Sequence, residues 1–164
     1  YFFTVNLQNR SANYLTEYIH LLREAVHTTK QKRPFKVDAW VVLPDHMHAV
    51  WTLPEQDSDF SSRWREIKKH FSKQLPKAEF QTENQKKRQE RGIWQRRFWE
   101  HSIRSESDFH RHIDYVYLNP VKHGHVGCVK DWPYSSFHRD VKLGIYSEDW
   151  YGKLEEETLN YGER

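Results

Sequence analysis

The feature that most constrains the fold is a pair of β-rich runs, residues 35–43 (FKVDAWVVL) and 47–53 (MHAVWTL), which lie almost next to each other in the chain. Both runs are rich in β-branched and aromatic residues, and the turn between them contains Pro44 and Asp45. The two runs therefore predict an antiparallel hairpin. Because side chains alternate along a strand, His46 and His48 at the start of the second strand should point to the same side of the sheet.

The segments around this hairpin show alternating strand and helix periodicities. Apolar spacing and β-rich composition predict a strand at 2–7, a helix at 14–29, a helix at 60–75, a strand at 97–104 and a final helix at 105–120. The order strand, helix, strand, strand, helix, strand is the split βαβ pattern of ferredoxin-like folds. We therefore predict an α+β fold, with an antiparallel sheet, helices on one face and an added C-terminal helix.

The final helix carries its own start and stop signals. Ser105 and Asp108 resemble an N-cap with a capping-box acid, and Pro120 is expected to end the helix. With about 100° between successive residues, Tyr115 and Asn119 lie about 40° apart around the helix. We therefore expect these two side chains to face outward together.

The other tyrosine of this helix belongs to a different face. Tyr117 lies about 160° from Tyr115 and falls with the apolar residues Phe109, Ile113 and Val116. The sequence therefore predicts that Tyr117 packs in the core. A helical tyrosine beside two histidines and an asparagine could form a metal-assisted nucleophile.

Length and composition favour one compact domain that spans residues 1–164. Its aromatic content, 15% of the residues, can form a sizeable core despite the high charge. The polar stretch 81–92 is predicted to be a mobile insertion, and 140–164 an acidic tail with three basic against seven acidic residues.

Several features indicate a cytoplasmic protein without a membrane anchor. Cys128 is the only cysteine, which excludes an internal disulfide and suits a reducing compartment. No apolar run reaches the roughly 18 residues that a membrane span requires, and no signal peptide precedes the first strand. The chain starts without Met, which suggests that its natural start is missing.

The middle of the chain is the candidate surface for binding an anion. Residues 59–104 contain thirteen Lys or Arg and six Asp or Glu, a local net charge of +7. Interleaved aromatic residues in this stretch favour single-stranded nucleic acid, although Trp64 and Phe71 fit a buried helical stripe better. The candidates for phosphate contacts, as a group, are Arg63, Arg65, Lys68, Lys69, Arg96, Arg97, Arg104 and His112.

Four motifs in order along the chain carry a family resemblance: WVVLPDHMHAVWTLP at 40–54, SSRWREIKKHF at 61–71, WQRRFWEHSIR at 94–104 and HIDYVYLNPVKHG at 112–124. Together they resemble the REP-associated tyrosine transposases, which belong to the single-tyrosine branch of the HUH nuclease superfamily. The likeness covers nearly the whole chain and is therefore much more specific than a lone His-x-His. It is weakest in residues 81–92 and in the acidic tail after Trp150.

The resemblance implies cleavage and rejoining of single-stranded DNA at repetitive extragenic palindrome (REP) hairpins through a 5′-phosphotyrosine. Carried over by position, His46, His48 and Asn119 would be ligands of Mg²⁺ or Mn²⁺, and Tyr115 would be the nucleophile. Members of this group are expected to act as monomers, whereas related transposases exchange tyrosine helices in dimers.

Two other classes of function remain open from the residues. The basic region could belong to a non-catalytic module that binds hairpins or single-stranded nucleic acid. The excess of histidine could also supply a zinc hydrolase, although no cysteine pair or HExxH motif supports that class. A covalent adduct between protein and DNA separates the transferase from the binding module.

Overall fold

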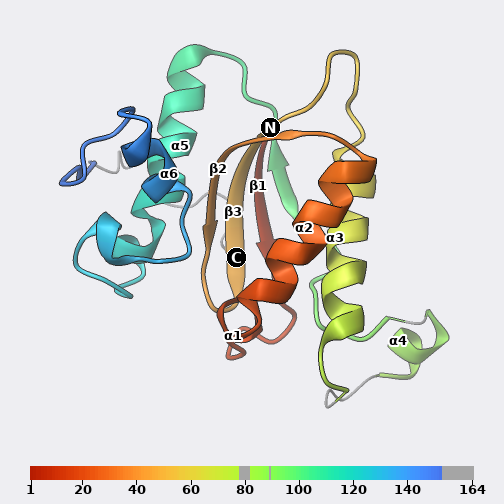
Figure 1. Cartoon of the computed structure of the whole chain (residues 1–164). Helices are drawn as coiled ribbons and strands as arrows, with labels where there is room; N and C mark the ends of the chain where they lie inside the picture. Colours follow the sequence, from red (N-terminus) through yellow and green to blue (C-terminus); the bar gives the residue numbers. More distant parts are fainter. Residues whose placement is uncertain (78–81, 89, 153–164) are drawn as a thin grey trace.

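A computed structural model describes residues 1–77, 82–88 and 90–152 of the chain (Figure 1). Its elements, in chain order, are β1 (Phe2–Asn6), α1 (Tyr14–Glu17), α2 (Ile19–Lys32), β2 (Lys36–Val42), β3 (His46–Thr52), α3 (Phe60–Gln74), α4 (Glu83–Lys87), β4 (Trp99–His101), α5 (Glu106–Lys122), the 3₁₀ turn η1 (Val129–Asp131) and α6 (Phe137–Lys142). In these described ranges, no helix combines the length and the apolar character that crossing a membrane would require.

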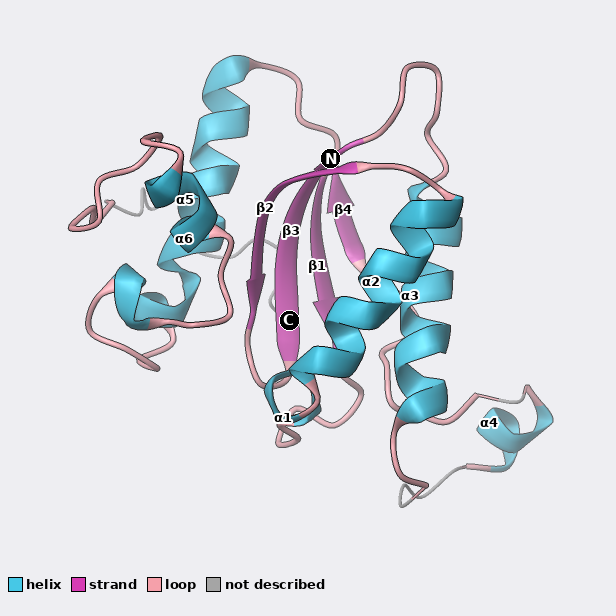
Figure 2. Ribbon diagram, viewed as in Figure 1, coloured by secondary structure: helices cyan, strands magenta, loops and turns pink. Residues whose placement is uncertain are grey.

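The sheet has four strands in the order β2-β3-β1-β4, and every neighbouring pair is antiparallel (Figure 2). This is the strand order of a split βαβ unit, so the predicted α+β, ferredoxin-like fold is confirmed. The register places Thr4 opposite His48 and Asn6 opposite His46. The hairpin thus presents its histidines beside the central strand.

The face of the sheet that meets α2 and α3 carries the aromatic core (Figure 1). Trp51 of β3 stacks on Trp64 of α3, with ring centroids 4.2 Å apart and planes 16° apart. Phe71 is also fully buried here. Trp64 and Phe71 are therefore core residues, as the helical periodicity predicted.

The opposite face of the sheet is covered by α5, with α6 packed beside that helix near the edge strand β2 (Figure 1). Phe2, Val41 and Val50 point to this side and meet Ile113 and Val116 of the helix. The segment that precedes α6 follows the edge of β2, where its backbone accepts from and donates to that strand at 2.9 and 2.8 Å. This contact covers part of an edge that would otherwise attract other strands.

Three predicted boundaries differ from the structure. The first helix is divided at Tyr18 and extends to Lys32, and the fourth strand covers three residues rather than 97–104, because β4 pairs only with Phe2–Thr4. Pro120 does not end α5, which continues to Lys122. A proline removes one hydrogen bond, and the next turn is still closed by the bond from His123 N to Asn119 O.

The structure describes part of the predicted mobile insertion and part of the predicted acidic tail. Within the predicted insertion at 81–92, Thr82 and Gln85 form a capping box for the short helix α4, whereas residues 81 and 89 lie outside the described residues. Arg91 donates to carbonyls at the C-terminal end of α3. Of the predicted acidic tail at 140–164, residues 153–164 lie outside the described residues, and Asp140 is a buried residue of α6.

Tyr117 links α5 to α6, and this link generates a stability prediction. Its hydroxyl donates to Asp140 Oδ2 at 2.5 Å in a buried position. We expect Tyr117→Phe to lower the free energy of unfolding by about 1–2 kcal/mol, because the carboxylate loses a buried donor. Chemical denaturation measures this change. Tyr151→Phe, at an exposed tyrosine, is the control, and equal stability of the two variants would contradict the prediction.

Candidate active site

His46 and His48 both lie on the face of the sheet that meets α5, and both are buried. Their rings are 5.1 Å apart between centroids and nearly perpendicular. The strand alternation therefore brings the two imidazoles together, as predicted.

Each of these histidines is held by a partner at its Nδ1 atom. His48 Nδ1 forms a hydrogen bond with Thr4 Oγ1 across the strand pair, at 2.9 Å, and His46 Nδ1 donates to Asp45 Oδ1 at 2.8 Å. A partner at Nδ1 fixes the ring orientation, and in His46, where Nδ1 donates to a carboxylate, it leaves Nε2 as the nitrogen that can ligate a metal.

Asp45 is itself fixed in an ionised state. Burial raises the pKa of its carboxyl, but the hydrogen bond from His46, the charge of a protonated His46 and the charge of Arg10 together outweigh burial, so the pKa of Asp45 lies below its ordinary value. Arg10 Nε lies 2.7 Å from Asp45 Oδ2. A carboxylate behind a histidine makes the imidazole a stronger ligand.

Helix α5 places Tyr115 and Asn119 against this part of the sheet. The Tyr115 ring lies 5.2 Å from the His48 ring and 5.8 Å from the Phe2 ring, both edge-on. Asn119 is one turn further along the helix and is also fully buried. The four residues singled out from the sequence, two histidines, the tyrosine and the asparagine, thus lie on facing elements.

The prediction that Tyr115 and Asn119 face outward is wrong, because both side chains have 0% exposure. The polar face of α5 meets the polar patch of the sheet formed by Thr4, His46 and His48, instead of water. A helical wheel gives only the angle between two residues, and it does not identify which face meets the sheet.

Tyr117 occupies a different environment, as its position on the helix predicted. Its ring meets Phe137 and Tyr146 at 5.4 and 5.3 Å, on the side of α5 toward α6. Burial and the bond to Asp140 raise the pKa of Tyr117 well above its ordinary value. A phenol held in that way is a poor nucleophile.

Lys122 is a neighbour of Tyr115 that was not predicted from the sequence. Lys122 Nζ donates to the Tyr115 hydroxyl at 3.3 Å and lies 5.0 Å from the centre of the ring. The two residues are seven apart, which places them on the same side of a helix. The signal was present in the sequence, but the helix was expected to end at Pro120, before Lys122.

The donors at this site fit a divalent ion. His46 Nε2 is buried and has no hydrogen-bond partner among the described residues. A buried nitrogen in that situation is costly unless a ligand satisfies it. Two imidazoles and an amide oxygen form a mixed nitrogen and oxygen set that transition ions such as Mn²⁺ accept well and that Mg²⁺ accepts less readily.

Four of the predicted phosphate contacts line one groove between α3 and residues 88–98. The groove has a volume of about 700 Å³, and its lining includes Arg65, Lys68, Lys69 and Arg96. Lys68 donates to Gln95 O at 3.1 Å, and burial lowers its pKa to about 8. Arg97 and Arg104 are exposed but do not line this groove.

Two of the predicted phosphate contacts are buried instead. The Arg63 guanidinium bonds to Asp57 Oδ2 at 2.7 Å and to Pro34 O at 2.8 Å, so it ties α3 to the preceding loops. His112 is a residue of α5 whose side chain is buried, and burial lowers its pKa below the ordinary value. Neither side chain offers a surface to a phosphate, and the sequence could not show this because the partners of Arg63 include a distant backbone carbonyl.

Comparisons with known proteins agree with this geometry. No protein-family model matches the chain. The chain is 51% identical, over 164 residues, to the REP-associated tyrosine transposase of Escherichia coli strain K12, covering all of this chain and 90% of the relative. It is 54% identical over 153 residues to a Haemophilus influenzae protein provisionally described as the same kind of transposase, covering 93% of this chain and 87% of that protein.

A solved structure of a REP-associated tyrosine transposase bound to a REP hairpin superimposes on this chain with a TM-score of 0.85 and 52% sequence identity. The match covers 99% of this chain and 90% of that one. Identity above one half over the full chain, together with the same fold, establishes the family. The chain belongs to the REP-associated tyrosine transposases, a family of transposase enzymes.

Proposed function

We propose that this protein is a metal-dependent endonuclease and strand transferase that acts on single-stranded DNA at REP hairpins and forms a 5′-phosphotyrosine intermediate. The observation that carries this proposal is the position of Tyr115, whose ring lies 5.2 Å from the His48 ring and whose hydroxyl accepts from Lys122. The solved relative bound to a REP hairpin supports the choice of substrate.

Tyr115 is the nucleophile in the proposed reaction. The Tyr115 hydroxyl gives up its proton to water, and its oxygen forms a bond to the scissile phosphorus while the bond to the 3′ oxygen breaks. The 3′ oxygen takes up a proton from water to become a 3′-hydroxyl. The ammonium of Lys122, 3.3 Å from the Tyr115 oxygen, stabilises the phenolate that attacks. The covalent bond conserves the energy of the phosphodiester, so a 3′-hydroxyl can later reverse the step.

His46, His48 and Asn119 would hold one Mg²⁺ or Mn²⁺ ion, which would polarise the scissile phosphate and stabilise its developing charge. Thr4 bonds to Nδ1 of His48 and Asp45 bonds to Nδ1 of His46, so both imidazole rings are held in orientation. Rings that are already oriented can ligate an ion with little reorganisation.

The basic groove is the proposed binding surface for the DNA hairpin. It lies beside α3, on the other face of the sheet from Tyr115, and its wall includes residues 94–96, which lead directly into the edge strand β4. Trp99 of β4 is 37% exposed and contacts Phe2 at 5.6 Å, and Phe2 contacts Tyr115. A flexible strand could therefore pass from the groove around the β4 edge to the nucleophile, stacking on Trp99.

We also propose that the chain acts as one nuclease domain and as a monomer. The histidines, the tyrosine and the asparagine all come from a single chain and already lie on facing elements. Light scattering of the complex with a hairpin oligonucleotide tests this state, and a complex with two protein chains per hairpin would contradict it.

We expect Tyr115→Phe to fold and to bind hairpin DNA but to form no covalent adduct, because only the attacking oxygen is removed. Incubation with labelled hairpin oligonucleotides and Mn²⁺, followed by denaturing electrophoresis, detects the adduct. Tyr117→Phe is the matched control and should retain substantial activity. An adduct in the Tyr115→Phe protein, or a nucleotide mapped to Tyr117, would favour a different nucleophile.

A second prediction concerns the metal ligands. We expect His48→Ala to reduce cleavage at least about 100-fold, because it removes an imidazole that would ligate the ion directly, while hairpin affinity changes little. EDTA should have the same effect on the unaltered protein. His20→Ala, at an exposed histidine of α2, is the control. Normal cleavage by His48→Ala, or by the unaltered protein in EDTA, would contradict the proposal that cleavage requires a metal ion at this site.

A third prediction concerns DNA binding. The protein should bind a hairpin with a single-stranded flank more tightly than a blunt duplex of equal length. Replacing Arg65 and Lys69 by Ala should weaken binding and reduce the salt slope by roughly 0.7–0.9 for each phosphate that the protein no longer neutralises. Arg23→Ala, at an exposed arginine of α2, should leave both quantities unchanged.

Fluorescence anisotropy at several salt concentrations measures these affinities. Arg63→Ala separates the two roles of arginine on α3, since it should lower stability and leave the salt slope intact. If the variant without Arg65 and Lys69 has the same salt slope as the parent, the DNA does not bind in this groove.

A further inference from the structure

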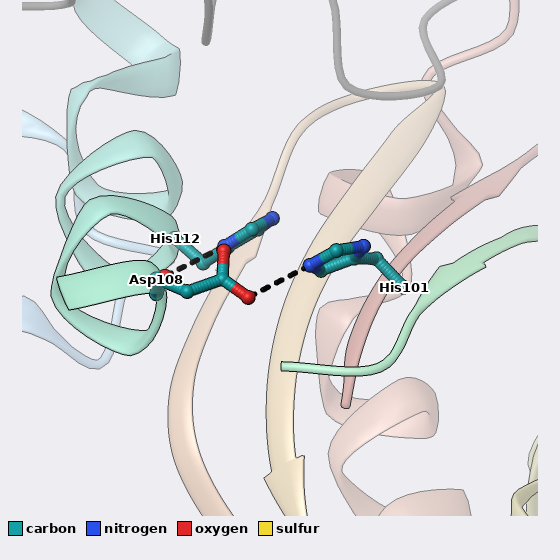
Figure 3. Close-up of side chains that lie close together, drawn as sticks. All are labelled: His101, Asp108 and His112. Atoms are coloured by element: carbon teal, nitrogen blue, oxygen red, sulfur yellow. Dashed lines mark hydrogen bonds and ion pairs between the residues drawn. The ribbon is translucent and has the colours of Figure 1, made fainter. Parts of the chain in front are cut away.

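A second cluster of metal-ligating side chains lies outside the site assigned above. It combines His101 of β4 with Asp108 and His112 of α5, and one ligand atom of each residue lies within 4.8 Å of the others. Figure 3 shows the Asp108 carboxylate between the two imidazole rings, which come from different elements. None of these three residues has a role in the proposed cleavage.

The three side chains are already arranged around one point. His101 Nε2 lies 2.9 Å from Asp108 Oδ2. His112 Nδ1 lies 2.8 Å from the backbone carbonyl oxygen of Asp108 and 3.1 Å from its Oδ1. The two rings are stacked, with centroids 4.8 Å apart and planes 15° apart. Further bonds hold the carboxylate, including one from Arg104 N at 3.1 Å, so its position does not depend on the histidines alone.

The spacing and burial also suit an ion. Asp108 and His112 are four residues apart, so they project from the same side of α5, as paired helical ligands do in zinc enzymes. His112 is buried, whereas the His101 side chain is 35% exposed. An ion would thus have three protein ligands and an open side from which it can enter and keep a water molecule.

We propose that His101, Asp108 and His112 form a second metal site, for a divalent transition ion of the zinc class, which fixes the beginning of α5 to β4. Two imidazoles and a carboxylate are the donors that zinc and its neighbours prefer, whereas Mg²⁺ and Ca²⁺ prefer oxygen donors. On binding, the ion would replace the contacts of both imidazoles with the carboxylate, and the bond of His112 Nδ1 to the Asp108 carbonyl, by metal–ligand bonds, and the ring nitrogens would release or shift their protons.

This site is separate from the one assigned to cleavage. His112 and Asn119 are seven residues apart on one helix, about 10 Å along its axis. Two ions that share one phosphate lie about 3.5–4 Å apart. The second ion would therefore act on the position of α5, and through it on Tyr115, rather than on the scissile phosphate.

Metal binding by a variant that lacks the first site tests the proposal. In the full chain with His46→Ala and His48→Ala, stripped of metal by a chelator, equilibrium dialysis against Zn²⁺ should find one equivalent bound. Adding His101→Ala should weaken that binding at least about tenfold. Removing a residue that only hydrogen-bonds to a metal ligand already weakens metal binding by about that factor, and removing a ligand itself should weaken it at least as much. Adding His110→Ala, an exposed histidine of the same helix, should leave it unchanged.

A second measurement tests whether metal binding stabilises the contact between α5 and β4. Zn²⁺ should raise the melting temperature of the His46→Ala and His48→Ala protein and slow amide exchange at the beginning of α5, and His101→Ala should abolish both effects. Asp108→Asn keeps the shape of the cluster and tests the carboxylate if His101→Ala unfolds. Co²⁺ in place of Zn²⁺ should give a visible absorption band that depends on His101.

The outcomes separate this proposal from the proposed function. If the His46→Ala and His48→Ala protein binds no Zn²⁺, or if its binding survives both His101→Ala and Asp108→Asn, the cluster is only a hydrogen-bonded link between β4 and α5 and the second site is wrong. Neither result tests the proposal that Tyr115 forms the covalent adduct, which is measured separately with the unaltered protein and Tyr115→Phe. Loss of the bound equivalent in both variants, with His110→Ala unaffected, establishes the site.

Discussion

The whole site depends on the contact between α5 and one face of the sheet. This contact buries polar side chains on both surfaces, with Thr4, His46 and His48 on the strands and Asn119 on the helix. Burying polar groups is costly unless they find partners, and here the partners of the two histidines include Thr4 of the neighbouring strand and Asp45. The aromatic core on the other face supplies the apolar burial that allows this face to be polar.

The order of the elements could be predicted from the sequence because strand and helix periodicities are local properties. The hairpin, the common side of His46 and His48 and the burial of Trp64 all follow from spacing alone. The side of α5 that meets the sheet could not be predicted, since polar residues were assigned to solvent although the sheet is polar there. The burial of Arg63 was missed for a related reason, because its partners include a distant carbonyl that spacing does not reveal.

Helix α3 illustrates how neighbouring residues of one type can serve different purposes. Arg63 points into the protein and is held by Asp57 and three backbone carbonyls, whereas Arg65 is exposed and lines the basic groove. Two residues of an α-helix that are two apart point about 160° away from each other, so one can anchor the helix while the other meets solvent. The local charge of the sequence therefore overstates the charge that DNA would encounter.

The burial of Tyr115 has a kinetic consequence. A phenol with no exposed surface, enclosed by Phe2, His48 and Lys122, cannot meet a phosphate until the helix or the ring moves. On the proposed mechanism, an opening step precedes each chemical step, and the rate of that opening is determined by the protein rather than by the DNA. Where this opening is slower than the chemistry, turnover with saturating substrate would report how often the helix or the ring moves, and substitutions far from the phosphate could change the rate without changing the chemistry.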